Sequence, residues 1–133
     1  MVLLGAILGC LAGGGEAVDE GGAQEVQWMD GMWAGLAMTV DAGIQESIAL
    51  AEEDRDGAAE LLQAVYAGSF EPELEPAVRL HLGAVRTMEV EWAFEIAREK
   101  LGRRRSDEAI QELRQALANV AAELDMLQAP IPR

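Results

Sequence analysis

Apolar residues in this chain recur at intervals of three and four positions, which is the spacing of one face of an α-helix. The clearest stripe lies near the C-terminus. It consists of Ile110, Leu113, Leu117, Val120, Leu124 and Leu127. Ser106 precedes this stripe as a candidate N-cap, and Asp107 and Glu108 place negative charge at the positive end of the helix dipole. The pattern therefore predicts a helix over residues 106–127, ahead of the C-terminal prolines.

The same spacing predicts three earlier helices, separated by turn residues. They cover residues 24–50, 57–67 and 76–101. Asp54 or Asp56 is a candidate N-cap of the second helix, and Gly68 is a candidate left-handed stop after it. Pro76 suits the first position of the third helix, because its missing N–H is not needed there, and Gly102 ends that helix. Four helices with short connections predict an all-α fold, namely an antiparallel four-helix bundle with up-down-up-down topology.

The composition is typical of a single domain built from helices. The chain has 133 residues, of which 50% are hydrophobic but only 5% are aromatic. A chain of this length buries a modest core without disulfides or metals. Its apolar residues are mostly Ala, Leu, Val and Ile, a composition that favours helix–helix packing over a β-sandwich. We assign the bundle domain to residues 24–128.

Charge is distributed unevenly along the chain. The net charge is −14, and no Lys, Arg or His precedes Arg55. Such an acidic protein repels phosphate backbones, which argues against nucleic acid as a partner. The classes left open are cationic partners, metal ions, and an acidic surface that only keeps the protein soluble.

The first residues resemble the end of a bacterial lipoprotein signal. The tetrapeptide ILGC, which ends at Cys10, has the aliphatic, variable, small and Cys order of a lipobox, in which the thiol accepts a diacylglycerol. Residues 1–9 are therefore interpreted as a lipoprotein-like signal remnant. Residues 10–23 are rich in Gly and acidic residues and are predicted to form a flexible, disordered linker.

Two features depart from that signal pattern. The apolar run before Cys10 is short, and no basic residue precedes it. A start codon assigned too far downstream explains both. A signal that is cleaved without lipidation, and a cytoplasmic N-terminus without an anchor, are the alternatives. The leading expectation is a lipid-anchored protein of the cell envelope that faces the periplasm.

Few residues are available for catalysis or for soft metal ligands. Cys10 is the single cysteine and His81 the single histidine of the sequence. A thiolate zinc site, an intramolecular disulfide and a Cys–His or Ser–His–Asp arrangement are therefore not expected. The sequence predicts a protein that is not an enzyme and gives no certain cofactor. Any metal site would rest on carboxylates, which suit iron or another divalent cation.

Five glutamates are the candidate metal ligands. They are Glu71, Glu73, Glu75, Glu89 and Glu91. The first three lie just before the third predicted helix, where negative charge also stabilises a helix start without any metal. Glu89 falls on an otherwise apolar stripe, and a buried carboxylate there would need a cation or hydrogen-bond donors. The alternative is that the helix is rotated so that Met88 fills this seam and Glu89 lies at its edge.

Residues 58–127 resemble the extracytoplasmic helical domain that is fused to, or encoded beside, bacterial iron permeases of the high-affinity iron transporter family. The segment AVYAGSFEPELEPAVR carries most of the resemblance, with a Tyr at a helix end, a Phe-Glu in the turn and a further Glu. The segment EWAF over residues 91–94 corresponds to the acid-then-Phe element of the next helix. Val65-Tyr66 stands where that family has Ala-Tyr.

The resemblance implies an accessory role, because the membrane helices of the permease and their Arg-Glu-Gly-Leu-Glu iron motif are missing from this sequence. The expected function is a non-enzymatic, envelope-tethered helical bundle that is accessory to uptake or sensing of a metal, namely iron. Its expected partners are the membrane, through a lipid on Cys10, and an iron permease or other envelope protein. The rival hypothesis is a structural or protein-interaction lipoprotein with no metal role.

The lipobox interpretation predicts the effect of one substitution. Cys10→Ser should move the protein from the membrane fraction to the soluble fraction, because a few apolar residues alone hold a bilayer weakly. Cell fractionation followed by immunoblotting measures this. Unchanged membrane association of the variant would contradict the interpretation.

Overall fold

The computed structural model describes residues 26–103 and 106–132, and every regular element within these ranges is helical. The elements are α1 (Met32–Ala51), α2 (Arg55–Val65), the π-helix η1 (Tyr66–Leu74), α3 (Glu75–Leu82), α4 (Ala84–Leu101) and α5 (Asp107–Met126). The prediction of an all-helical fold is confirmed. The predicted signal remnant, the linker and Cys10 lie outside the described residues.

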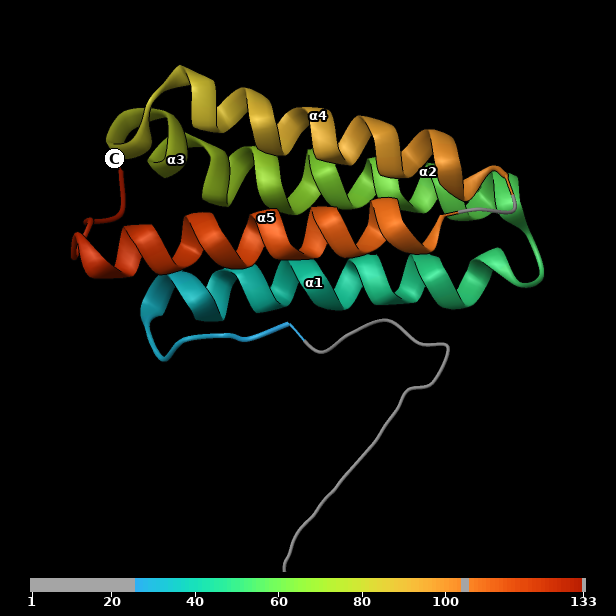
Figure 1. Cartoon of the computed structure of the whole chain (residues 1–133), viewed down its shortest axis with the longest axis horizontal. Coiled ribbons are helices and arrows are strands. Elements are labelled where there is room, and N and C mark those ends of the chain that lie inside the picture. Colours follow the sequence, from blue (N-terminus) through green and yellow to red (C-terminus); the bar gives the residue numbers. More distant parts are fainter. Residues whose placement is uncertain (1–25, 104–105, 133) are drawn as a thin grey trace, which may run out of the picture.

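Four helical rods lie side by side around one core (Figure 1). α1 and α4 each pack against both α2 and α5, so these four helices form the corners of the bundle. The turn between α1 and α2 lies at the same end as the C-terminus of α4 and the N-terminus of α5, and α3 lies at the opposite end (Figure 1). The largest fully buried side chains come from every element: Trp33, Val40, Ile44, Leu62, Phe70, Leu74, Val78, Val90, Leu101, Leu113, Leu117 and Leu124.

α1 begins at Met32 rather than near residue 24, because its cap comes from a distant part of the chain. The carboxylate of Asp125 on α5 accepts hydrogen bonds of 2.9 Å from the backbone N–H groups of Trp33 and Ala34. A carboxylate at this position satisfies donors that no helical carbonyl reaches, and it complements the helix dipole. A Cβ atom at Gly31 would lie 2.2 Å from Asp125, so glycine leaves the room that this cap needs.

α2 does not stop at Gly68, as the sequence predicted, but continues into η1. The helix begins at Arg55, where Asp54 accepts a hydrogen bond of 2.9 Å from the backbone N–H of Gly57. η1 contains Pro72, which inside an α-helix would remove a donor and clash with the preceding turn. The backbone forms π-helix here, a local widening that is frequent at functional sites. The rod is thereby extended to Leu74, which is buried in the core.

The helix predicted over residues 76–101 is divided at Gly83. Its φ of 96° lies in the left-handed region that residues with a Cβ rarely adopt. The break resets the helical phase. The residues that α4 then buries are Thr87, Val90, Phe94, Ala97 and Leu101. Glu89 and Met88 are both exposed, so neither fills the seam, and both interpretations of the predicted stripe are wrong.

α5 agrees closely with its prediction. The residues of its stripe that are buried are Ile110, Leu113, Leu117, Val120 and Leu124. Ser106 lies at the N-cap position but makes no side-chain capping hydrogen bond. The start of the helix therefore gains its favourable charge from Asp107 and Glu108 in the first turn.

A charged pair crosses the core between α1 and α5. Asp41 is buried, and its carboxylate accepts hydrogen bonds from Arg114 Nε at 2.7 Å and Arg114 Nη2 at 3.0 Å. Gln45 Nε2 donates a third hydrogen bond of 2.7 Å to the same carboxylate. Such a bidentate pair with an additional donor satisfies the hydrogen-bonding needs that a buried charge imposes. This ion pair therefore links α1 to α5.

Leu117 in α5 and Leu127 just after it give a matched test of this packing. Leu117 is 0% exposed, whereas Leu127, which directly follows the helix, is 58% exposed. Leu117→Ala should lower the free energy of unfolding by about 2–5 kcal/mol, because it leaves a cavity in the core. Leu127→Ala should change it by less than about 0.5 kcal/mol. Urea denaturation followed by circular dichroism measures both, and equal losses would show that the phase of α5 is wrong.

Candidate functional site

Three aromatic rings join the end of the α2 rod to α4. The centroid of the Tyr66 ring lies 5.7 Å from that of Phe70 and 5.2 Å from that of Phe94, and the two phenylalanine centroids are 5.3 Å apart. These separations are those of favourable aromatic pairs, and the Tyr66–Phe94 pair is edge-to-face. Because Phe70 and Phe94 are buried, the contacts hold the Tyr66 ring, at the start of η1, against α4.

Three glutamates and an arginine lie around the phenol of Tyr66. We call the five residues the Tyr66 cluster: Tyr66, Glu71, Glu75, Arg79 and Glu91. Burial, followed by the negative charges of Glu75, Glu91 and Glu71, raises the pKa of Tyr66 from its ordinary 10.0 to about 12. The negative field therefore opposes ionisation of the phenol, and the phenol stays neutral to a higher pH than an ordinary tyrosine.

Arg79 on α3 bridges two of these carboxylates. Its Nη2 atom lies 2.6 Å from Glu75 Oε2 and 3.3 Å from Glu91 Oε2. The side chain of Arg79 is 51% exposed, whereas that of Glu75 is 12% exposed. The guanidinium thus covers the cluster from the solvent side, where an exposed ion pair contributes little to stability. One cation already neutralises part of the charge of the three glutamates.

Two carboxylates of the cluster, Glu91 and Glu75, lack full compensation for being removed from water. The pKa of Glu91 is raised, first by burial and then by the neighbouring carboxylate of Glu75, although Arg79 opposes this. Within residues 26–103 and 106–132, Glu75 Oε1 is a buried oxygen without a hydrogen-bond partner. An unpaired buried carboxylate oxygen is costly and favours a further donor or a cation.

The cluster is not a preformed metal site. Over the described part of the chain, no three Asp, Glu, His or Cys side chains are arranged so that they could hold an ion as they stand. The donor types nevertheless suit a hard cation, because carboxylate and phenol oxygens are the ligands that such ions prefer. A cation could enter only if the Arg79 guanidinium moved away from Glu75 and Glu91.

The structure brings together three of the five glutamates predicted as ligands. Glu71, Glu75 and Glu91 belong to the Tyr66 cluster. Glu73 is exposed on η1 and is not among the groups that act on Tyr66 or Glu91. Glu89 is also separate, because it is exposed and pairs with Arg86 at 3.1 Å. The predicted lipid anchor, Cys10, lies outside the described residues.

Sequence reasoning missed the centre of this arrangement. Neither Tyr66 nor Arg79 was among the residues predicted to form a site. The spacing of Glu75 and Arg79 by four residues is the available signal, because such a pair meets on one face of a helix. The contact of Arg79 with Glu91 spans twelve residues and a break at Gly83, which no local pattern shows.

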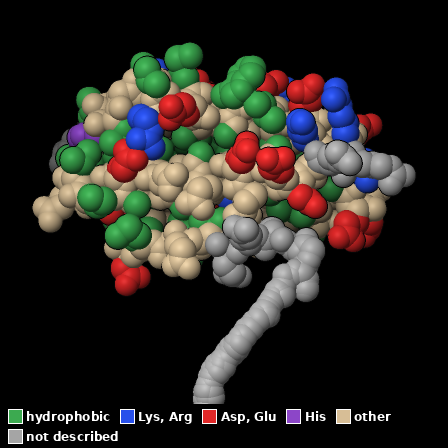
Figure 2. Space-filling view, viewed as in Figure 1, with side chains coloured by type: hydrophobic (Ala, Val, Ile, Leu, Met, Phe, Trp, Pro, Cys, Tyr) green, Lys and Arg blue, Asp and Glu red, His purple; other side chains and the backbone are tan. Residues whose placement is uncertain are grey.

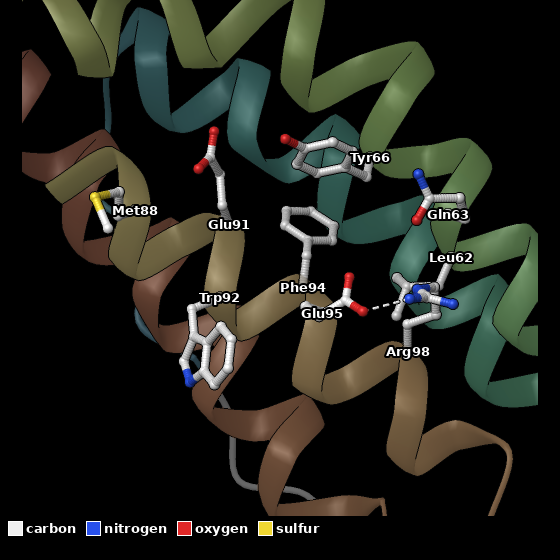
Figure 3. Close-up of a pocket in the computed structure, with 9 residues that line it drawn as sticks. All are labelled: Leu62, Gln63, Tyr66, Met88, Glu91, Trp92, Phe94, Glu95 and Arg98. Atoms are coloured by element: carbon white, nitrogen blue, oxygen red, sulfur yellow. Dashed lines mark hydrogen bonds and ion pairs between the residues drawn. The ribbon is translucent and has the colours of Figure 1, made fainter. Parts of the chain in front are cut away.

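A groove with a volume of about 450 Å³ runs beside the cluster, between α2 and α4. Figure 3 shows Tyr66 and Glu91 on one side of it and Glu95 and Arg98, which form an ion pair, on another. The apolar residues that line the groove are Leu62, Met88, Trp92 and Phe94. Its volume lies within the range of small-ligand pockets, and its polar lining residues are Gln63, Tyr66, Glu91, Glu95 and Arg98.

No family model matches the chain, and neither curated proteins nor solved structures give a match. No helix among the described residues is long and apolar enough to cross a membrane. The resemblance to the iron-permease accessory domain therefore stays a prediction. The features that bear on function are the Tyr66 cluster and the groove beside it.

The pKa of Tyr66 is directly measurable, because it is the single tyrosine of the chain. Its phenolate absorbance should appear with a midpoint at about 12 rather than at 10.0. The raised pKa stabilises the fold fully below pH 10.0, and that contribution is lost as the pH rises through about 12. Near-ultraviolet titration measures the midpoint, with circular dichroism to verify the fold at each pH.

Two variants locate the cause of this shift. Glu75→Gln should lower the pKa of Tyr66 towards 10.0, because it removes the negative charge that acts most strongly on the phenol. Glu89→Gln should leave the pKa unchanged, because Glu89 is not among the charges acting on Tyr66. A wild-type midpoint at the ordinary value in the folded protein would show that the glutamates do not surround Tyr66.

Proposed function

We propose that this protein is a non-enzymatic helical bundle, tethered at the cell envelope, that binds a cation as an accessory to metal uptake or sensing, with iron as the metal. The observation that carries the proposal is the convergence of three carboxylates on one phenol. Glu71, Glu75 and Glu91 come from η1, α3 and α4 and act together on Tyr66. A helix start is stabilised by carboxylates in its own first turn, so that role does not require carboxylates from three different elements.

In this proposal, Arg79 is the resident counter-ion that an incoming cation displaces. Its guanidinium is half exposed and reaches the carboxylates from outside, so it can leave without opening the core. Glu75 then offers two oxygens, of which Oε1 has no partner among the described residues, and Glu91 offers its carboxylate from the facing helix. Iron suits these ligands because they are hard oxygen donors.

Because the cation must displace Arg79, it binds more weakly than it would at a site without a competing counter-ion. Binding is therefore reversible, which suits an accessory protein that passes a metal on. The net charge of −14 supports capture, since an acidic surface raises the local concentration of cations. The lipid anchor predicted at Cys10 would hold the cluster near the membrane, where a permease or other envelope protein would receive the metal. The rival function, a structural lipoprotein, gives the Tyr66 cluster no metal role.

Thermal melts with and without ferrous or ferric iron test the proposal. At about a hundredfold excess of iron over its dissociation constant, the wild type should gain about 2.7 kcal/mol of stability. Glu75→Gln and Glu91→Gln should abolish this gain. Arg79→Gln should enlarge it, because the competing cation is gone.

Glu89→Gln is the matched control, since it removes one exposed carboxylate of α4 that lies outside the cluster. Its melting temperature should rise with iron as in the wild type. If the wild type melts at the same temperature with and without each ion, the metal function is lost, because a ligand that binds only the native state must stabilise it. An equal response of all variants would place the binding elsewhere on the acidic surface.

A further inference from the structure

α4 exposes an apolar stripe that the Tyr66 cluster does not use. Val85, Met88 and Trp92 are 69%, 61% and 65% exposed, and their spacing of three and four residues places them on one face of the helix. Figure 2 shows hydrophobic side chains along the upper edge of the molecule, where α4 runs in Figure 1. Contiguous exposed apolar side chains on a small protein are typical of an interaction site.

The stripe borders the groove between α2 and α4. Met88 and Trp92 line the groove from α4, together with Leu62 and Phe94, whose side chains are buried (Figure 3). From Met88 to Arg98 the lining residues of α4 cover about 15 Å, at about 1.5 Å per residue. That length corresponds to about three turns of an α-helix laid along the groove.

The charges around the groove determine whether a positively or a negatively charged partner is favoured. At one end, the Tyr66 cluster carries three carboxylates against the guanidinium of Arg79. At the other end, Glu95 and Arg98 neutralise each other. The groove is therefore negative at the Tyr66 end and nearly neutral at the far end. An occupant with positive charge at one end and apolar anchors along its length complements this pattern.

A second copy of the chain that pairs α4 with α4 about Trp92 does not meet that requirement. If two α4 helices packed antiparallel with Trp92 on the two-fold axis, Arg86 would face Arg98, because both lie six positions from residue 92. Glu89 would likewise face Glu95, three positions from the axis. Like charges that face each other oppose association, and each copy also carries a net charge of −14.

We propose that the groove between α2 and α4 is a docking site for a cationic amphipathic helix of a partner protein. Apolar residues on one face of that helix pack against Trp92 and Met88, and its basic residues lie at the Tyr66 end. Methionine adapts its shape to such a partner, and tryptophan is a frequent anchor of interfaces. The inference does not rest on the metal function, because it uses the negative charge of the Tyr66 cluster and the apolar residues Trp92 and Met88 but no bound metal.

Calorimetric titration of the full chain with a designed peptide tests the docking site. The probe is an amidated Leu/Lys helix of about four turns, with leucines at positions i, i+3, i+4 and i+7. It should bind with one-to-one stoichiometry. Trp92→Ala and Met88→Ala should each weaken binding about tenfold, as expected for interface anchors. Met38→Ala, which removes an exposed methionine from α1, should leave the affinity unchanged.

Three controls distinguish docking in the groove from charge attraction, self-association and membrane binding. A scrambled peptide of the same composition should bind at least about tenfold more weakly, because its lysines remain but its apolar face is gone. Equal binding of both peptides, equal binding to Trp92→Ala, or no binding at all would overturn the proposal. So would a Trp92-dependent dimer in sedimentation velocity, or Trp92-dependent binding to phosphatidylcholine–phosphatidylglycerol vesicles without peptide.

The metal and docking functions fail independently. Trp92→Ala should keep the iron-dependent gain in melting temperature, because Trp92 is no candidate ligand. Glu75→Gln should lose that gain and bind the peptide more weakly than the wild type, because one carboxylate at the Tyr66 end is gone, but its binding should still depend on Trp92. Circular dichroism of each variant checks that the exposed substitutions leave the helical fold intact.

Discussion

The packing of Tyr66 against Phe70 and Phe94 is the contact on which both candidate sites depend. It ties η1, which follows α2 without a break, to the middle of α4. Because Phe70 and Phe94 are buried, η1 cannot shift along α4 without exposing large aromatic surfaces to water. The position of Glu75 relative to Glu91, and the groove between α2 and α4, are both set by this contact.

Two backbone irregularities place the residues of both candidate sites around this aromatic contact. The π-helix around Pro72 carries the α2 rod to Leu74, so that Glu75 begins α3 beside the Tyr66 phenol. The break at Gly83 then sets the phase of α4. In that phase Phe94 is buried and Glu91 is half-buried, while Met88 and Trp92 lie outside. A regular helix through Gly83 would have a different face towards the core.

Local pattern explains the part of the fold that the sequence could predict. α5 carries an uninterrupted stripe with acidic residues in its first turn, and its structure agrees from Ile110 to Leu124. The start of α1 was not predictable in this way, because its cap, Asp125, lies 92 positions from Trp33. The break at Gly83 was missed because a glycine within a helix costs only about 1 kcal/mol and is often tolerated.

The sequence predicted the types of residue that form the candidate site, but not which of these residues come together. Acidic residues near Tyr66 were evident, and three of the predicted ligands do gather there, whereas Glu73 and Glu89 do not. What selects among them is tertiary: the aromatic contact, the turn at Gly83, and the Arg79 bridge between α3 and α4. A partly buried phenol with a raised pKa cannot be inferred from a sequence that gives no distance between helices.

The most direct test of the central claim is anomalous diffraction from crystals of the protein soaked in iron, recorded at the iron absorption edge. The account predicts an anomalous peak between the carboxylates of Glu75 and Glu91, with the Arg79 guanidinium displaced from both. Crystals in which Arg79 still bridges the two glutamates, with no peak between them or with iron bound elsewhere on the surface, would contradict it.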